Sequence, residues 1–188
     1  MAKAMRAIEQ NVSARKTSFR IEPEPARRSI LMIGGQCGGG DNFNLVPDEC
    51  FFTIDRRINP EEDLVAEKQR LLDELTRLRS GGIDLDVEVF QEAYPASVTE
   101  DNAVGRALSE SIESVTGAPA QFEMCPGILE TRFYSRRGVP AFAYGPGLLS
   151  VSHGPREFIK LKDLYAATNV YALTAVRLFE TGIESGVG

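Results

Sequence analysis

One histidine, His153, stands out among the residues whose side chains could do chemistry. It follows a short apolar segment, at a place where a strand would pass into a loop. An imidazole in such a position is typical of a metal ligand or of a general acid or base. A zinc site needs two or three further donors, and the chain has no second histidine. From the residues alone, a structural role and a ligand role for His153 both stay open.

Arg57 is the second candidate. Arg56 and Arg57 end a predicted strand over residues 49–57, so their side chains must lie on opposite faces of it. One of them can therefore face a cleft and bind a carboxylate with its two-pronged guanidinium. The alternative is a surface arginine on a solvated sheet face. Asn44 lies thirteen residues before Arg57, at the entry to the same strand.

The glycine-rich run 34–41 resembles a phosphate cradle, but it lacks the Gly-Lys-Ser/Thr and the helix that such a loop needs. We predict a loop between two strands, because so many glycines hold a regular element poorly. Cys37, Cys50 and Cys125 are odd in number and widely spaced, which indicates neither a zinc ribbon nor a disulfide framework. A reducing compartment, most simply the cytoplasm, is the expected location.

The elements that must position these residues form two groups. In residues 1–94 the order helix, strand, strand, helix, strand predicts a ferredoxin-like α/β sandwich with two helices on one side of an antiparallel sheet. Asn59 is expected to cap the second helix, which Gly81 and Gly82 would end. The expected helices cover residues 3–16 and about 60–80, and the expected strands cover residues 29–33, 49–57 and 84–90, with room for another near 17–21.

Residues 95–188 predict an incomplete α/β/α segment. A helix over 101–117 and short strands at 120–124 and 140–144 precede a last helix at 161–179. That helix is apolar on most sides, so we expect it to be buried against a sheet. Two strands make a poor sheet, which is why the segment is expected to be incomplete as a domain.

The bulk composition sets limits on function. The chain has 188 residues, of which 43% are hydrophobic, and its formal net charge is −6. These values are typical of an ordinary globular protein and argue against a general nucleic-acid binder, which would present a basic face. No apolar run approaches the length that spans a membrane, and the N-terminus lacks the apolar core of a signal peptide.

A family resemblance rests on several of these motifs in order. The pairs and runs Gly34-Gly35, Asn44-Leu-Val-Pro-Asp48 and Asp55-Arg-Arg57 resemble the lid-domain signature of the di-zinc amidohydrolases. That family includes acetylornithine deacetylase, succinyl-diaminopimelate desuccinylase and carboxypeptidase G. The runs that begin at Cys125, Tyr144 and His153 are similar to the end of the family's catalytic domain.

The resemblance implies roles for four residues. His153 would bind one of two zinc (or cobalt) ions, whereas Asn44, Arg57 and Gly127 would contact the substrate, an N-acyl amino acid or a related peptide. Residues 1–94 would be a lid that pairs two subunits, and residues 95–188 would end the catalytic domain. The reaction would be hydrolysis of an N-acyl amide, with a metal-bound water and a glutamate base.

The sequence also departs from the family pattern. The family's other metal ligands and its general-base glutamate belong to an N-terminal half absent here, so no catalytic residue is expected in this chain and we expect it to be inactive alone. Ile128 stands where desuccinylases carry a hydroxyl, which puts succinyl specificity in doubt. Two other functions stay open: a non-catalytic module that dimerises through the strand at 84–90, and an amino-acid sensor built from residues 1–92.

Overall fold

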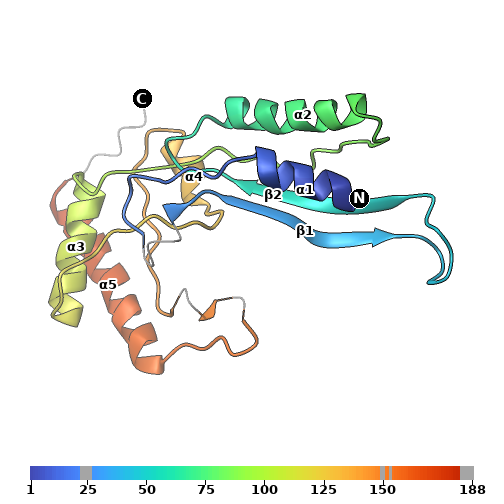
Figure 1. Cartoon of the computed structure of the whole chain (residues 1–188). Coiled ribbons are helices and arrows are strands. Elements are labelled where there is room, and N and C mark those ends of the chain that lie inside the picture. Colours follow the sequence, from blue (N-terminus) through green and yellow to red (C-terminus); the bar gives the residue numbers. More distant parts are fainter. Residues whose placement is uncertain (22–26, 149–150, 153, 183–188) are drawn as a thin grey trace. The chain divides into compact units, whose positions relative to one another are not determined.

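A computed structural model describes residues 1–21, 27–148, 151–152 and 154–182. Figure 1 shows a mixed α/β chain with helices and a two-stranded antiparallel sheet. The chain divides into two compact units, each described by itself. Unit 1 comprises Met1–Pro95 and Glu123–Ile128, and unit 2 comprises Ala96–Phe122 and Leu129–Gly188. The assignment of residues 1–94 to a lid and 95–188 to a catalytic segment stays a prediction.

The sheet of unit 1 is an antiparallel ribbon made of β1 (Ile30–Gly39) and β2 (Cys50–Arg57). Ile33 pairs with Ile54 and Cys37 with Phe52, and the register shifts between these two pairs. The prediction that residues 34–41 form a loop was wrong for most of the run, since β1 continues to Gly39. Glycines can take part in the strand because the hydrogen bonds between strands use backbone groups only. The shift in register between Ile33 and Cys37 accommodates the glycines at 34 and 35.

Helices α1 (Ala2–Asn11) and α2 (Leu64–Ser80) lie on one face of this ribbon (Figure 1). Alternate residues of both strands point toward the helices, as the period of two along a strand requires. The resulting core centres on Ala4, Ile8, Leu75 and Leu78, against which Leu31, Ile33, Phe52 and Ile54 pack. Two helices on one side of an antiparallel sheet were predicted, and this part of the prediction is confirmed.

The start of α2 corrects one detail. Asp63, and not Asn59, is the N-cap residue, and its Oδ1 accepts a hydrogen bond of 2.7 Å from the Ala66 backbone N–H. Asn59 is buried one turn earlier, where its backbone N–H donates to Glu62 and its side-chain amide donates to the Arg15 carbonyl. Tertiary contacts therefore hold Asn59. The helix ends before Gly81 and Gly82, as predicted.

The strand predicted at residues 84–90 is not formed. Arg79 of α2 donates to the Leu85 carbonyl and pairs with Asp86 at 2.8 Å, so this segment is bonded to the helix instead of to a strand. Residues 17–21 form no strand: an isolated β-bridge joins Lys16 to Arg28, and the Arg20 carbonyl accepts a hydrogen bond from the Met124 backbone N–H. Among the described residues, the sheet has two strands, and the larger sheet of a ferredoxin-like sandwich was a wrong prediction.

Unit 2 is built on α3 (Ala103–Thr116) and α5 (Leu161–Glu180), with a short α4 (Thr131–Ser135). The buried residues of both long helices are mostly small, which lets the two backbones approach closely: Gly105, Ala107, Leu108 and Ser111 on α3, and Ala167 and Val170 on α5. Arg177 of α5 adds polar contacts to Glu110 at 2.9 Å and to the Ser114 hydroxyl at 3.0 Å.

Two predictions for unit 2 were wrong. The segments 120–124 and 140–144 are not strands; an edge-to-face contact of Phe122 with Phe142, at 5.2 Å between ring centroids, lies there instead. Helix α5 is not buried against a sheet, since large apolar residues such as Tyr165 and Phe179 are exposed. Only part of the apolar surface of α5 is therefore buried by other described residues. No helix among them is long and apolar enough to span a membrane.

Candidate functional site

Arg57 lies on the face of the ribbon opposite the helices, which we call the open face. Its Nε donates to the Asp55 carboxylate at 2.9 Å, and its side chain is 39% exposed. Its cross-strand neighbour is Ile30, and that of Asp55 is Met32. The open face therefore presents an arginine and a carboxylate beside two half-exposed apolar side chains. Such a surface can bind an anion that carries an apolar group.

Arg56 points to the helix face, where its guanidinium is bonded to other groups of the protein. Its Nη2 lies 2.9 Å from Glu62 and 3.0 Å from Glu67, and all three side chains are less than a tenth exposed. Its Nη1 donates to the Arg57 carbonyl oxygen at 2.9 Å. A guanidinium with two buried carboxylates as partners has no capacity for a substrate carboxylate. Of the two arginines, only Arg57 can act as the predicted clamp.

Asn44 lies in the exposed connection between β1 and β2. Figure 1 shows this connection at the end of the ribbon away from the last residues of β2. Cys50 to Arg57 is seven steps of about 3.3 Å, so more than roughly 20 Å separates the connection from Arg57. Asn44 and Arg57, two of the three predicted substrate residues, are therefore not brought together within one chain, and a single small substrate could not contact both.

Gly127 belongs to the segment Glu123–Ile128, which packs with unit 1. Met124 donates its backbone N–H to the Arg20 carbonyl at 2.7 Å, and Arg20 pairs with Glu123 at 3.3 Å. The Gly127 N–H donates to the Cys125 sulfur at 3.4 Å, which closes a small turn. The turn is exposed, so its backbone is accessible to a ligand.

His153, the predicted metal ligand, lies outside the described residues. Within the part of the chain that the structure describes, no group of three or more His, Cys, Asp or Glu residues could hold a metal ion. Zinc needs three or four such donors converging on one point. The described residues therefore do not fit a zinc centre by themselves.

Two carboxylates not predicted as site residues, Asp55 and Glu61, make side-chain hydrogen bonds in unit 1. Asp55 holds Arg57, and its position two residues before Arg57 on a strand could have indicated this. Glu61 accepts hydrogen bonds from the Thr17 hydroxyl and from both the hydroxyl and the backbone N–H of Ser18. Burial alone would raise the pKa of Glu61, but these bonds outweigh it and hold the pKa below its ordinary value. No sequence signal foretold this contact.

Two curated proteins are similar to this chain over most of its length. The chain is 29% identical over 148 residues to succinyl-diaminopimelate desuccinylase of Pseudomonas syringae pv. syringae, which covers 79% of this chain and 37% of that protein. It is 27% identical over 144 residues to the enzyme of the same name from Magnetococcus marinus, with 75% and 36% covered. The chain thus spans little more than a third of the length of these relatives.

A solved structure shares the fold. An M20 family metallo-carboxypeptidase from Sulfolobus solfataricus superimposes with a TM-score of 0.66 at 19% identity, over 94% of this chain and 42% of that one. The profile of Peptidase family M20/M25/M40 matches residues 4–177, nearly the whole chain. The resemblance inferred from the motifs is confirmed: this chain belongs to peptidase family M20/M25/M40.

Proposed function

We propose that the chain is the lid and C-terminal catalytic segment of a cytoplasmic, zinc-dependent amidohydrolase that hydrolyses N-acyl amino acids or related amides. The observation that carries the proposal is the family match over residues 4–177. The named relatives are desuccinylases, which remove an acyl group from an amino group. An exposed arginine on the open face supports the same chemistry, because the product amino acid carries a carboxylate.

Arg57 is proposed to bind that carboxylate. Asp55 occupies its Nε, so a substrate carboxylate would bind to the two terminal Nη groups, with the fork geometry that favours arginine over lysine. The apolar neighbours Ile30 and Met32 would exclude water from the pair and strengthen it. Asn44 and Gly127 are proposed to contact the substrate from elsewhere, Asn44 in the site of another subunit because of its distance from Arg57.

The acyl group is proposed to be other than succinyl. Ile128 is half-exposed beside Gly127 and offers no hydroxyl to a second carboxylate. An apolar side chain there favours a short uncharged acyl group over one that ends in a charge. Parallel assays with N-acetyl and N-succinyl substrates, in a protein with its full set of donors, would show higher kcat/KM for the acetyl compounds.

The metal is proposed to bind His153 together with donors from outside these 188 residues. The isolated chain is then expected to bind zinc weakly and to hydrolyse no N-acyl amino acid, because one histidine does not make a closed site. The test measures zinc per chain and turnover on a panel of N-acyl amino acids, for wild type and His153→Ala. We expect both proteins to be equally poor in zinc and inactive. Turnover that a chelator abolishes, in the wild-type chain, would contradict the proposal.

A second candidate function is association without catalysis. The open face carries the half-exposed residues Ile30, Met32 and Phe51, which a second copy of this chain could cover. The predicted edge at residues 84–90 is not a strand, so pairing would use the open face instead. Sedimentation equilibrium of wild type and Met32→Asp tests this association: wild type should form a dimer, and Met32→Asp should stay monomeric. A wild-type chain that stays monomeric at high concentration rules out this association.

A further inference from the structure

Cys37 and Cys50 are diagonal neighbours on the same face of the ribbon. Cys37 pairs with Phe52, and Cys50 pairs with Gly39, so each cysteine is two residues from the other's partner. Paired residues share a face of an antiparallel ribbon, and residues two apart on a strand do so too. Phe52, the partner of Cys37, packs against the core under the helices, so both cysteines are on the helix face. They lie at the end of the ribbon that continues into the Asn44 connection.

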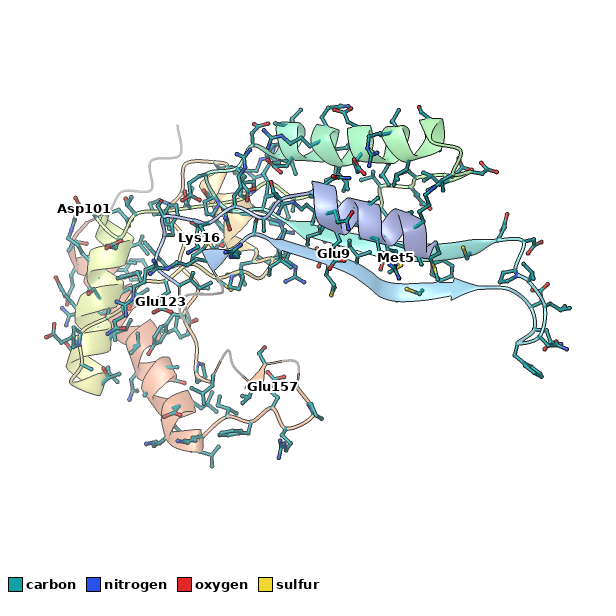
Figure 2. All side chains as sticks on the ribbon, viewed as in Figure 1. Met5, Glu9, Lys16, Asp101, Glu123 and Glu157 are labelled. Atoms are coloured by element: carbon teal, nitrogen blue, oxygen red, sulfur yellow. The ribbon has the colours of Figure 1, made fainter. Side chains whose placement is uncertain are left out.

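Contacts of two glycines describe where the two cysteine side chains lie. A Cβ built on Gly39 would lie 2.7 Å from the Cys50 Cβ, so the Cys50 side chain is directed over Gly39. A Cβ built on Gly34 would lie 3.0 Å from the Cys37 sulfur and 2.7 Å from the Met5 methyl of α1. The Cys37 thiol donates to the Gly34 carbonyl at 3.5 Å, so it is turned toward Gly34 and must rotate about its Cα–Cβ bond to reach Cys50. Figure 2 labels Met5 on α1, the helix that covers this face. The Met5 contact places Cys37 on the side of the helices, the register places Cys50 on the same face, and both cysteines are exposed.

The Cα spacing expected from this register is somewhat longer than a disulfide accepts, so the bond requires a backbone shift at this end of the ribbon. Diagonal neighbours in antiparallel strands have Cα atoms about 7–8 Å apart, with shorter separations between Cβ atoms. A disulfide accepts Cα separations up to about 6.8 Å. The small difference falls at a strand end where Gly38, Gly39 and Gly40 follow one another, and glycines adjust their backbone with little steric cost.

We propose that Cys37 and Cys50 form a reversible disulfide within one chain, with oxidised glutathione or a similar small disulfide as the oxidant. The thiolate of one cysteine attacks a sulfur of oxidised glutathione, the S–S bond breaks, and one glutathione thiolate leaves. The second cysteine attacks the protein-bound sulfur of the mixed disulfide and releases the second glutathione. The protein loses two electrons, the small disulfide gains them, and the two thiol protons pass to the released glutathione.

The link would act on the connection that carries Asn44. It joins the two strands at the point where that connection begins and ends, so oxidation would restrict the conformations of residues 38–49. If Asn44 contacts a substrate, as the proposed function has it, the thiol pair makes that contact sensitive to oxidation. The disulfide itself does not depend on the proposed function, and its test needs no catalytic activity.

The test incubates the purified chain with oxidised glutathione and measures its intact mass and its non-reducing peptide map. Cys125→Ser is expected to lose two hydrogen atoms, with Cys37 joined to Cys50. Wild type should show the same link, with at most one glutathione added at Cys125, and dithiothreitol should restore the starting mass of both proteins. Cys125→Ser is the matched control because Cys125 is the third free cysteine of this chain. Cys37→Ser and Cys50→Ser should instead keep one glutathione at the remaining partner.

Three outcomes would overturn the inference. The first is stable glutathione on both Cys37 and Cys50 in the same molecule, and the second is a link that includes Cys125. The third is a disulfide between two chains. It would appear as a dimer on a non-reducing gel even when the protein is diluted before it is oxidised.

Discussion

The guanidinium of Arg56 donates a hydrogen bond to the carbonyl oxygen of Arg57 at 2.9 Å. The buried arginine thereby fixes the backbone of the exposed one. Glu62, in the turn before α2, and Glu67, in the first turn of α2, hold the Arg56 side chain. The orientation of the proposed substrate arginine depends on a charge network on the other face of the same strand.

Replacement of Arg56 by methionine tests this network. Two buried carboxylates would lose their common partner, and removal of one member of a buried ion pair costs about 3–5 kcal/mol. We expect urea unfolding to show a loss of free energy of that size. The control is Arg57→Met, which breaks a half-exposed pair with Asp55 and should cost no more than about 1 kcal/mol. Equal losses in both variants would mean that Arg56 does not anchor the start of α2.

Glu61 predicts a pH dependence of stability. Its pKa is lower in the folded chain than its ordinary value of 4.5. Its contribution is therefore complete above about pH 4.5 and is lost as the pH falls through the lower, folded value. Glu61→Gln should be less stable than wild type at neutral pH, and the gap should narrow on acidification.

Urea midpoints measured from neutral pH to acid would follow this effect. Glu9→Gln is the control, because Glu9 is an exposed carboxylate of the same unit, on α1. Its midpoint should stay parallel to that of wild type over the whole range. A Glu61→Gln curve that also runs parallel to wild type would contradict the proposed hydrogen-bonded carboxylate.

Gly39 is expected to tolerate no side chain. Its φ is +144°, and an added Cβ would lie 2.5 Å from the Glu49 carbonyl oxygen. Gly39→Ala should therefore open the end of the ribbon and destabilise the chain by more than about 1 kcal/mol. Amide hydrogen exchange should speed up at β1 and β2 near Cys50.

Gly35→Ala serves as the comparison, since its new Cβ would mainly meet the flexible Met32 methyl at 3.3 Å. It should change exchange little and cost under about 1 kcal/mol. Unchanged exchange in Gly39→Ala would show that the two strands are not in close contact at this end. It would also weaken the basis for a Cys37–Cys50 disulfide.

Arg57→Lys tests the proposed carboxylate clamp in a protein that has the full donor set. A lysine keeps the charge and loses the two-pronged geometry, so KM should rise roughly tenfold, equivalent to about 1.4 kcal/mol, with kcat little changed. Arg137→Lys, at an exposed position of unit 2, is the control and should leave KM unchanged. An unaltered KM in Arg57→Lys would remove Arg57 from the substrate site.

The sequence by itself determined where the long helices and the two paired strands lie, but not all of their ends: α1 ends at Asn11 instead of residue 16, and β1 continues to Gly39 instead of residue 33. Their signals are local: a one-turn apolar spacing for α1, α2 and α3, glycines after α2 and α3, and β-rich runs before Gly34 and around Ile54. It also determined the family, because motif residues such as Asn44 and Arg57 occur in the family's order. The separation of Arg56 from Arg57 followed from the period of two along a strand.

Only the tertiary structure decided which arginine is available and how the weaker segments fold. Arg56 and Arg57 are chemically identical, and the choice between them depends on which face of β2 α2 covers. The alternation at residues 84–90 does not make a strand, because no neighbouring strand pairs with it among the described residues; Arg79 of α2 contacts Leu85 and Asp86 there. The proximity of Cys37 and Cys50 likewise comes from strand register, which brings together residues that are far apart along the chain.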